Sequence, residues 1–243
     1  VLAINTRVHA VNGARLQGQQ TLRGGLEILS GELREISTKG GDLIELDPEY
    51  LTIRGQREFG LVCAVNYGGG SAQLTALRIG RGFAVGDSVF VLHDNDPERA
   101  TDDEWFGGTV SAVGTSTACG GNPSQILTLP FVAATAAAFT PDSVRVGAPI
   151  RGFDVFTYGQ YEVDGEQFLA RQARLAANPD PLVGPLPPSG GVAFRYLDAQ
   201  GKETKKDTLV AQIELTLRYE SALRGFDNEL VSDSVLLRIF PRN

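Results

Sequence analysis

The first 36 residues carry the feature that most constrains the fold of this sequence, an apolar repeat with helical spacing. Five large side chains recur three or four positions apart, which places them on one face of a helix: Leu22, Leu26, Leu29, Leu33 and Ile36. Charged residues such as Glu27 and Glu35 fall on the opposite face. A helix over residues 1–36 spans about 54 Å, which is longer than a small domain needs. The pattern predicts one long helix that buries this stripe, while its upstream half either projects or packs against something outside the body.

Glycines interrupt the helical segment and give it a second property. Each one lowers helix stability by about 1 kcal/mol relative to alanine, at Gly13, Gly18, Gly24, Gly25 and Gly31. A glycine also lets another backbone approach closely, so the same positions favour contact with a neighbouring helix. We expect the helix to stop near residues 38–41, where a lysine is followed by two glycines that fit a C-cap.

After residue 41 the pattern changes to short alternating segments typical of strands. Residues 50–54 and 59–65 read as a hairpin across 55–57, and clear alternation returns at 192–197, 209–219 and 231–240. The Ala-rich segment 131–140 reads as either a short helix or a buried apolar stretch. Helices do not alternate with strands, which argues against a doubly wound parallel sheet. The expected class is α+β, with one long helix packed on antiparallel sheet.

The few cysteines and histidines limit the kinds of metal site and catalytic site that the chain can form. The chain has two cysteines, Cys63 and Cys119, and two histidines, His9 and His93. No CxxC pair exists, which disfavours structural zinc and thioredoxin-like chemistry. No GxSxG elbow surrounds a serine, and a Cys–His dyad lacks a cysteine at a helix N-terminus. In an oxidising compartment Cys63 and Cys119 are candidates for one disulfide, whose loop contributes about 4 kcal/mol in the chain-entropy model.

An acidic loop at residues 94–104 raises the question of a metal. Its carboxylates Asp94, Asp96 and Glu98 are candidate Ca²⁺ ligands, because Ca²⁺ takes about six to eight oxygen ligands. The loop does not fit the EF-hand pattern, which needs glycine at its sixth position and a glutamate at its twelfth, where Trp105 stands. A solvated loop is the main interpretation, Ca²⁺ is the alternative, and no other cofactor is expected.

Charge and hydropathy exclude two classes of protein. The chain has 243 residues and a net charge of -7. This acidic balance argues against general nucleic-acid binding, which needs a basic stripe. No apolar run approaches the roughly 20 residues of a membrane span. The chain contains no methionine, so we expect it to be a processed or trimmed piece of a longer protein.

Six segments, taken in order, carry a resemblance to a known family. They cover residues 22–37, 49–54, 83–91, 155–158 with 167–171, 192–201, and 235–243. Their order and spacing resemble the PilW-like minor pilins of type IV pili and the related J-type minor pseudopilin of type II secretion. The sequence departs from that pattern at its front, where the prepilin peptidase site and the apolar half of the helix are not present.

The resemblance implies a pilin-like α+β fold and a structural role rather than an enzyme. Residues 1–36 would be the soluble half of the pilin helix, and residues 37–243 a β-rich headpiece with an elaborated region at about 55–150. Such subunits are anchored in the inner membrane by the missing upstream segment. They then join other minor and major pilins through the helix, prime assembly or cap the tip, and lie outside the cytoplasm.

Three alternatives to a pilus subunit stay open at this point. One is a minor pseudopilin of a type II secretion system, although the region 55–150 is long for that. Another is a tip adhesin or DNA-uptake module that uses the loops at 66–72, 94–104 and 116–123. A secreted enzyme is the third, because a retaining glycosidase needs only two carboxylates about 5 Å apart.

Overall fold

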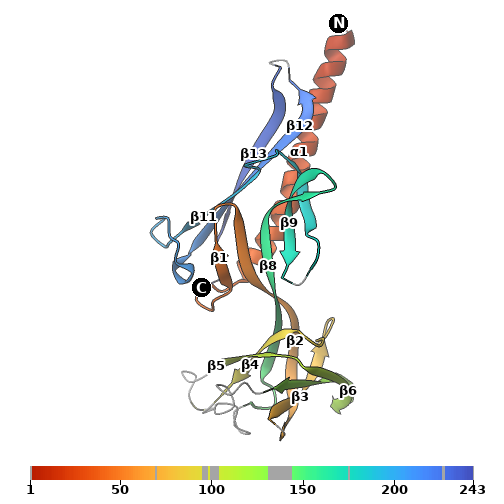
Figure 1. The fold of residues 1–243 in the computed structure, drawn as a ribbon, viewed down its shortest axis with the longest axis vertical. Coiled ribbons are helices and arrows are strands. Elements are labelled where there is room, and N and C mark those ends of the chain that lie inside the picture. Colours follow the sequence, from red (N-terminus) through yellow and green to blue (C-terminus); the bar gives the residue numbers. More distant parts are fainter. Residues whose placement is uncertain are drawn as a thin grey trace. The chain divides into compact units, whose positions relative to one another are not determined.

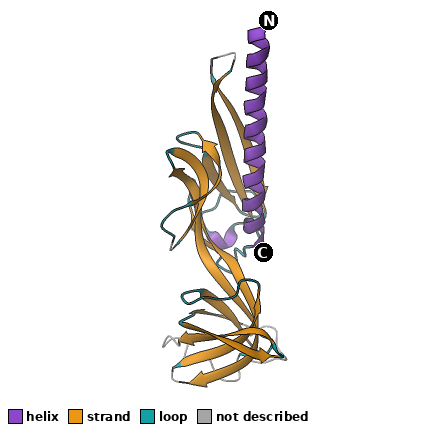
Figure 2. Cartoon of the chain, turned by 90° about the vertical axis from the view of Figure 1, so that its right-hand side faces the viewer, coloured by secondary structure: helices purple, strands orange, loops and turns teal. Residues whose placement is uncertain are grey.

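The computed structural model describes residues 2–68, 70–94, 98, 104–130, 144–174, 176–225 and 228–242. These contain the helix α1 (Leu2–Glu35), the 3-10 turn η1 (Asp207–Leu209) and thirteen strands (Figures 1 and 2). The strands are β1 (Leu43–Leu46), β2 (Tyr50–Gly68), β3 (Ser71–Ile79), β4 (Ser88–His93), β5 (Glu104–Thr109), β6 (Ala112–Cys119), β7 (Asn122–Pro130), β8 (Pro149–Val163), β9 (Glu166–Ala173), β10 (Asp180–Leu186), β11 (Val192–Leu197), β12 (Gln212–Arg224) and β13 (Leu230–Ile239). The Ala-rich segment 131–140 lies outside the described residues.

The expected α+β, pilin-like class is wrong. More than half of the described residues lie in strands, accompanied by one N-terminal helix and a curled, half-barrel antiparallel sheet, so the fold is β-rich. The long N-terminal apolar repeat suggested a larger share of helix than the fold contains. Periodicity identifies elements one at a time and does not show how much sheet they form together.

The chain divides into two compact units. The first contains Val1–Gly55 and Val155–Asn243, and the second contains Gln56–Asp154. The second unit covers nearly the same residues as the elaborated region expected at about 55–150. Its boundaries fall inside β2 and β8, so both strands contribute residues to both units. The hairpin expected across residues 55–57 is wrong, because β2 continues through a buried Gly55.

The first unit holds α1 and two sets of antiparallel strands. One set is β11–β12–β13, and the other pairs β8 with β9, β9 with β10, and β1 with β2. Helix α1 contacts β10, β12 and β13. The five stripe residues are all buried, each with less than a tenth of its surface exposed: Leu22, Leu26, Leu29, Leu33 and Ile36. They share one core with inward residues of β12, such as Ile213, Leu215 and Leu217.

Two glycines of α1 set how closely the helix lies against the strands. A Cβ at Gly18 would overlap the ring of Tyr219 on β12, and a Cβ at Gly25 would overlap the Val183 side chain on β10. In contrast, a Cβ at Gly13, Gly24 or Gly31 would meet no atom of the described residues within 4 Å. The helical glycines therefore belong to two faces, one in contact with the unit's own strands and one open.

Backbone and side-chain hydrogen bonds close the C-terminal end of α1. Gly41, with φ of 75°, donates its N–H to the Thr38 carbonyl at 3.3 Å. The Asp42 carboxylate accepts from the Ser37 N–H at 2.8 Å, and Arg242 donates its backbone N–H to the Ile36 carbonyl at 3.0 Å. The last residues of the chain thus fasten the end of the helix, consistent with a glycine-based C-cap.

The second unit has its own core and a covalent crosslink. Strands β2, β3, β7 and β6 pair in that order, and β4 pairs with β5 and β8. Alternate residues of β3 point inward, including Ala72, Leu74 and Ala76. A disulfide joins Cys63 on β2 to Cys119 at the end of β6, with Cα atoms 5.5 Å apart. The two cysteines of the sequence are thereby both accounted for.

The two glycine faces of α1 give a matched pair of substitutions on adjacent residues. Gly25→Ala is expected to destabilise the protein by about 1–3 kcal/mol, because the new methyl overpacks against Val183. Gly24→Ala is expected to stabilise it by up to about 1 kcal/mol through helix propensity alone. Denaturant unfolding of the two variants measures both effects, and equal shifts for the two would contradict the packing.

Loss of the disulfide should weaken the second unit. Cys63 and Cys119 are 56 positions apart, and opening a loop of that length costs about 4 kcal/mol in the chain-entropy model. A Cys63→Ser, Cys119→Ser double variant should therefore unfold at clearly lower denaturant than the parent. Added reductant should lower the midpoint of the parent and leave that of the double variant unchanged, which is the internal control.

Candidate functional site

The outer face of α1 is the surface of the first unit that could receive a neighbouring helix. Leu16 and Ile28 are large apolar side chains with 60% and 49% of their surface exposed. Gly13, Gly24 and Gly31 follow one another at spacings of 11 and 7 residues, close to whole numbers of helical turns. They therefore form one line along the helix, and the space beside each is open.

Charge is distributed unevenly along the exposed part of α1. Arg15 and Arg23 are exposed in the middle of the helix, whereas Glu27 and Glu35 are exposed nearer its end. The two arginines are eight residues apart, and so are the two glutamates. Glu27 follows Arg15 by twelve residues, and Glu35 follows Arg23 by twelve. Arg34 stands in the last turn, where the helix dipole favours a cation. The helix thus carries a basic segment followed by a mainly acidic one.

Another acidic residue of α1, Glu32, is used inside the first unit. Its Oε1 atom accepts from Nη1 of Arg171 on β9 at 2.9 Å. Arg171 also reaches Asp180 on β10 at 3.3 Å and lies over the ring of Phe156 on β8, 5.0 Å from its centroid. These contacts join the helix to three strands. Because Glu32 takes part in them, it does not belong to the outer surface of α1.

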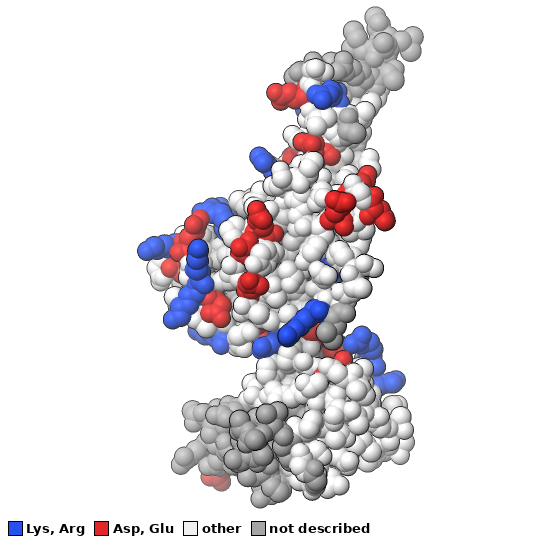
Figure 3. Space-filling view, viewed as in Figure 1, with Lys and Arg blue, Asp and Glu red and all other residues white. Residues whose placement is uncertain are grey.

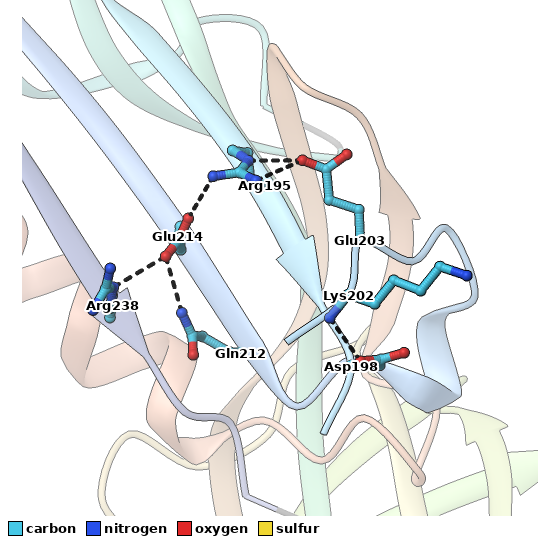
Figure 4. Close-up of polar contacts among 7 residues, drawn as sticks. All are labelled: Arg195, Asp198, Lys202, Glu203, Gln212, Glu214 and Arg238. Atoms are coloured by element: carbon cyan, nitrogen blue, oxygen red, sulfur yellow. Dashed lines mark hydrogen bonds and ion pairs between the residues drawn. The ribbon is translucent and has the colours of Figure 1, made fainter. Parts of the chain in front are cut away.

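A compact ionic cluster crosses the three-stranded sheet on the face away from the core (Figure 4). Glu214 of β12, only 6% exposed, lies between Arg195 of β11 and Arg238 of β13, its partners in the strand register. Its Oε2 is 3.1 Å from Arg195 Nη1, and its Oε1 is 3.0 Å from Arg238 Nε. Gln212 donates to the same Oε1 at 3.1 Å. Both carboxylate oxygens are occupied, so the cluster fastens strands rather than offering a free acid or base.

The ionic cluster continues toward the loop that follows β11. Arg195 also pairs with Glu203 at 2.8 Å, and Asp198 accepts the Lys202 N–H at 2.9 Å within the turn (Figure 4). Around it, acidic and basic side chains are interspersed on the face of the first unit that Figure 3 shows. Such mixing gives local pairing rather than a field of one sign.

The second unit contains a buried carboxyl group that the sequence did not reveal. Glu58 on β2 is 3% exposed and pairs with Arg81, whose side chain is largely exposed. Burial raises the pKa of the Glu58 carboxyl above its ordinary value, and the Arg81 guanidinium opposes that rise only in part. His93 on β4 is also buried, with Phe106 edge-on at 4.5 Å. Alternation along 88–93 places His93 on the same face as Val89 and Val91, and that face is the buried one. The burial of Glu58 was not anticipated from the sequence.

The candidate metal ligands are not brought together in the described residues. Asp94 forms an ion pair with Arg145, with 3.2 Å between Oδ2 and Nε. Asp96 lies outside the described residues, and Glu98 is described alone between undescribed neighbours. Among the described residues no group of three His, Cys, Asp or Glu side chains could hold a metal ion.

The structure also assigns a place to each residue considered for nucleophilic catalysis. Cys63 and Cys119 are joined, so neither sulfur is a thiol. His9 lies exposed on α1 in the first unit, and His93 is buried in the second. Within the part of the chain that the structure describes, no helix combines the length and the apolar composition needed to cross a bilayer.

Comparison with known proteins finds no matching family model, no matching curated protein and no matching solved structure. Support for a function therefore comes from the surfaces of the chain itself.

The buried Glu58 gives the second unit a pH-dependent stability. Because its folded-state pKa is raised, its contribution to stability is fully present below the ordinary glutamate pKa and is lost as pH rises through the raised value. Glu58→Gln should therefore be more stable than the parent at neutral pH, with the difference shrinking as the pH falls toward about 4. Denaturant midpoints across this pH range measure it. Glu166→Gln, at the exposed start of β9, is the control, and a constant difference across the range would exclude titration of Glu58.

Proposed function

We propose that this chain is a structural minor subunit of a type IV pilus-like filament. In this role it primes assembly or caps the tip by packing α1 against the helices of neighbouring subunits. The proposal rests on the surface of the helix and on the sequence resemblance, not on the fold class. A structural role is also favoured because the ionic groups of the first unit mainly pair with one another across strands.

The observation that carries the proposal is the division of α1 into two faces. One face is fully used by the unit's own strands, through the leucine stripe and the close contacts at Gly18 and Gly25. The other face exposes Leu16 and Ile28 beside a line of glycines with open space. These glycines weaken the helix, and a Cβ at any of them would meet nothing within 4 Å in the described part of the chain. Close approach of a second helix gives them a use, because small side chains let backbones come near.

The order of charges favours a particular packing of the neighbouring helix. Arg15 and Arg23 precede Glu27 and Glu35 by twelve residues each, which is about 18 Å along a helix. On the side of the open glycines, a parallel helix displaced by this step brings its Arg23 beside Glu35, whereas Arg15 stands on the opposite side of the helix. Such a head-to-tail contact does not close on itself, so its repetition generates a filament.

Crosslinking in the producing cells tests this assignment. A cysteine replacing Leu16 should form crosslinks between the chain and other filament subunits with a short bismaleimide, because Leu16 lies on the proposed contact face. Thr117→Cys, exposed on β6 of the second unit, is the matched control and should give few such crosslinks. Equal crosslinking at the two positions, or none at Leu16 in cells that carry filaments, contradicts the proposal.

The charge arrangement predicts a second readout of the same test. Arg23→Glu should lower Leu16→Cys crosslinking, since it places like charges beside the acidic segment of the neighbour. Arg218→Glu, an exposed arginine on β12, should leave crosslinking unchanged. Recovery of the crosslinked chain in sheared surface filaments would assign a pilus, and its retention in the periplasm would assign a type II secretion pseudopilus instead.

A further inference from the structure

A pocket in the first unit stands apart from α1 and from the ionic cluster. Its volume is about 510 Å³, within the range of about 300–1,000 Å³ that is usual for small-molecule sites. Strand β8, the start of β2, and the loop before β11 surround it. The residues that matter most are Tyr50, Tyr161, Glu49, Gln167 and Ser189.

A glycine and two aromatic rings form one wall of the pocket. Gly159 lies beside both tyrosines, since a Cβ there would be 3.2 Å from Tyr50 Cβ and 3.6 Å from Tyr161 Cε2. Tyr50 is oriented by its hydroxyl group, which donates to Glu45 Oε1 at 2.9 Å. The missing side chain at residue 159 therefore keeps the space between the two aromatic residues open.

One glutamine, Gln160, holds the loop 187–191 beside the pocket in place. Gln160 Nε2 donates to the Pro187 carbonyl at 2.8 Å, and Gln160 Oε1 accepts the Gly191 N–H at 2.9 Å. The same amide donates to Gln167 Oε1 at 3.3 Å. These bonds fix both ends of the loop 187–191, so the pocket is formed before any ligand arrives, which lowers the entropy lost on binding.

Several polar groups at the pocket have hydrogen-bonding capacity to spare. Within the described residues, the Glu49 carboxylate, the Tyr161 hydroxyl and the Ser189 hydroxyl make no hydrogen bond to protein. Gln167 adds an amide beside them. Together they offer donors and acceptors next to aromatic rings, without any lysine, arginine or histidine in the lining.

From this combination we propose that the pocket binds a neutral saccharide. Sugar rings present apolar C–H faces to aromatic side chains and hydroxyl groups to amides, carboxylates and hydroxyls. Phosphate or carboxylate ligands do not fit, because the lining has no cation and contains Glu49. The proposal does not rest on the filament role, since no residue of α1 lines this pocket.

Saturation-transfer NMR on the full chain tests the proposal. The probes are glucose, galactose, N-acetylglucosamine and maltose, each at about 10 mM, a concentration that reveals millimolar affinity. At least one should receive saturation from the protein. Tyr161→Ala should raise the dissociation constant, obtained by titrating that sugar, by about 2- to 13-fold, the range expected for loss of an aromatic contact. Phe240→Ala removes an exposed ring outside the pocket and is the matched control.

Two further variants separate loss of the site from loss of the fold. Glu49→Gln keeps the shape of an exposed side chain and should weaken saturation, whereas Glu166→Gln should not. Ser189→Trp should fill the pocket and remove the signal while the thermal midpoint stays near that of the parent. Absence of saturation for all four sugars overturns the proposal, and so does a signal in the pocket variants equal to that of the parent. The peptide tetra-alanine serves as a non-sugar probe, and saturation of this peptide without saturation of any sugar also overturns the proposal.

Discussion

The close contact between α1 and the strands of the first unit is the constraint on which the other features of that unit depend. It requires the leucine stripe to be buried and requires glycine at residues 18 and 25, where any side chain would overlap Tyr219 or Val183. Once this contact is made, the orientation of the helix about its own axis is fixed. Leu16, Ile28 and the other three glycines must then face outward.

The surfaces proposed for function follow from this arrangement and from the rigidity of the strands. In the proposed filament the outer face of α1 receives another helix, and the charges along it set the direction of stacking. The pocket proposed to bind a saccharide is built from β8, β2 and the loop that Gln160 holds. The two surfaces share no residues, so contact through the helix leaves the residues of the pocket uncommitted.

Local patterns in the sequence predicted individual elements better than the whole fold. The helix over 1–36 corresponds to α1, and alternation placed strands at 192–197 and 231–240, where β11 and β13 lie. The α+β class was wrong because counting strands does not reveal which of them pair or how sheet accumulates. The turn expected at 55–57 was also wrong: a buried Gly55 within a long strand carries the same local signal as a glycine in a turn.

The sequence by itself determined which face of the helix is apolar and which residues alternate in the strands, because both depend only on the geometry of single elements. Only the tertiary structure decided that Glu214 meets Arg195 and Arg238, that Glu58 is buried, and that Tyr50 and Tyr161 flank Gly159. Glu214 lies 19 positions from Arg195 and 24 from Arg238, and Tyr50 lies in another strand than Gly159. These contacts depend on strand register and on side-chain packing, which no short stretch of sequence encodes.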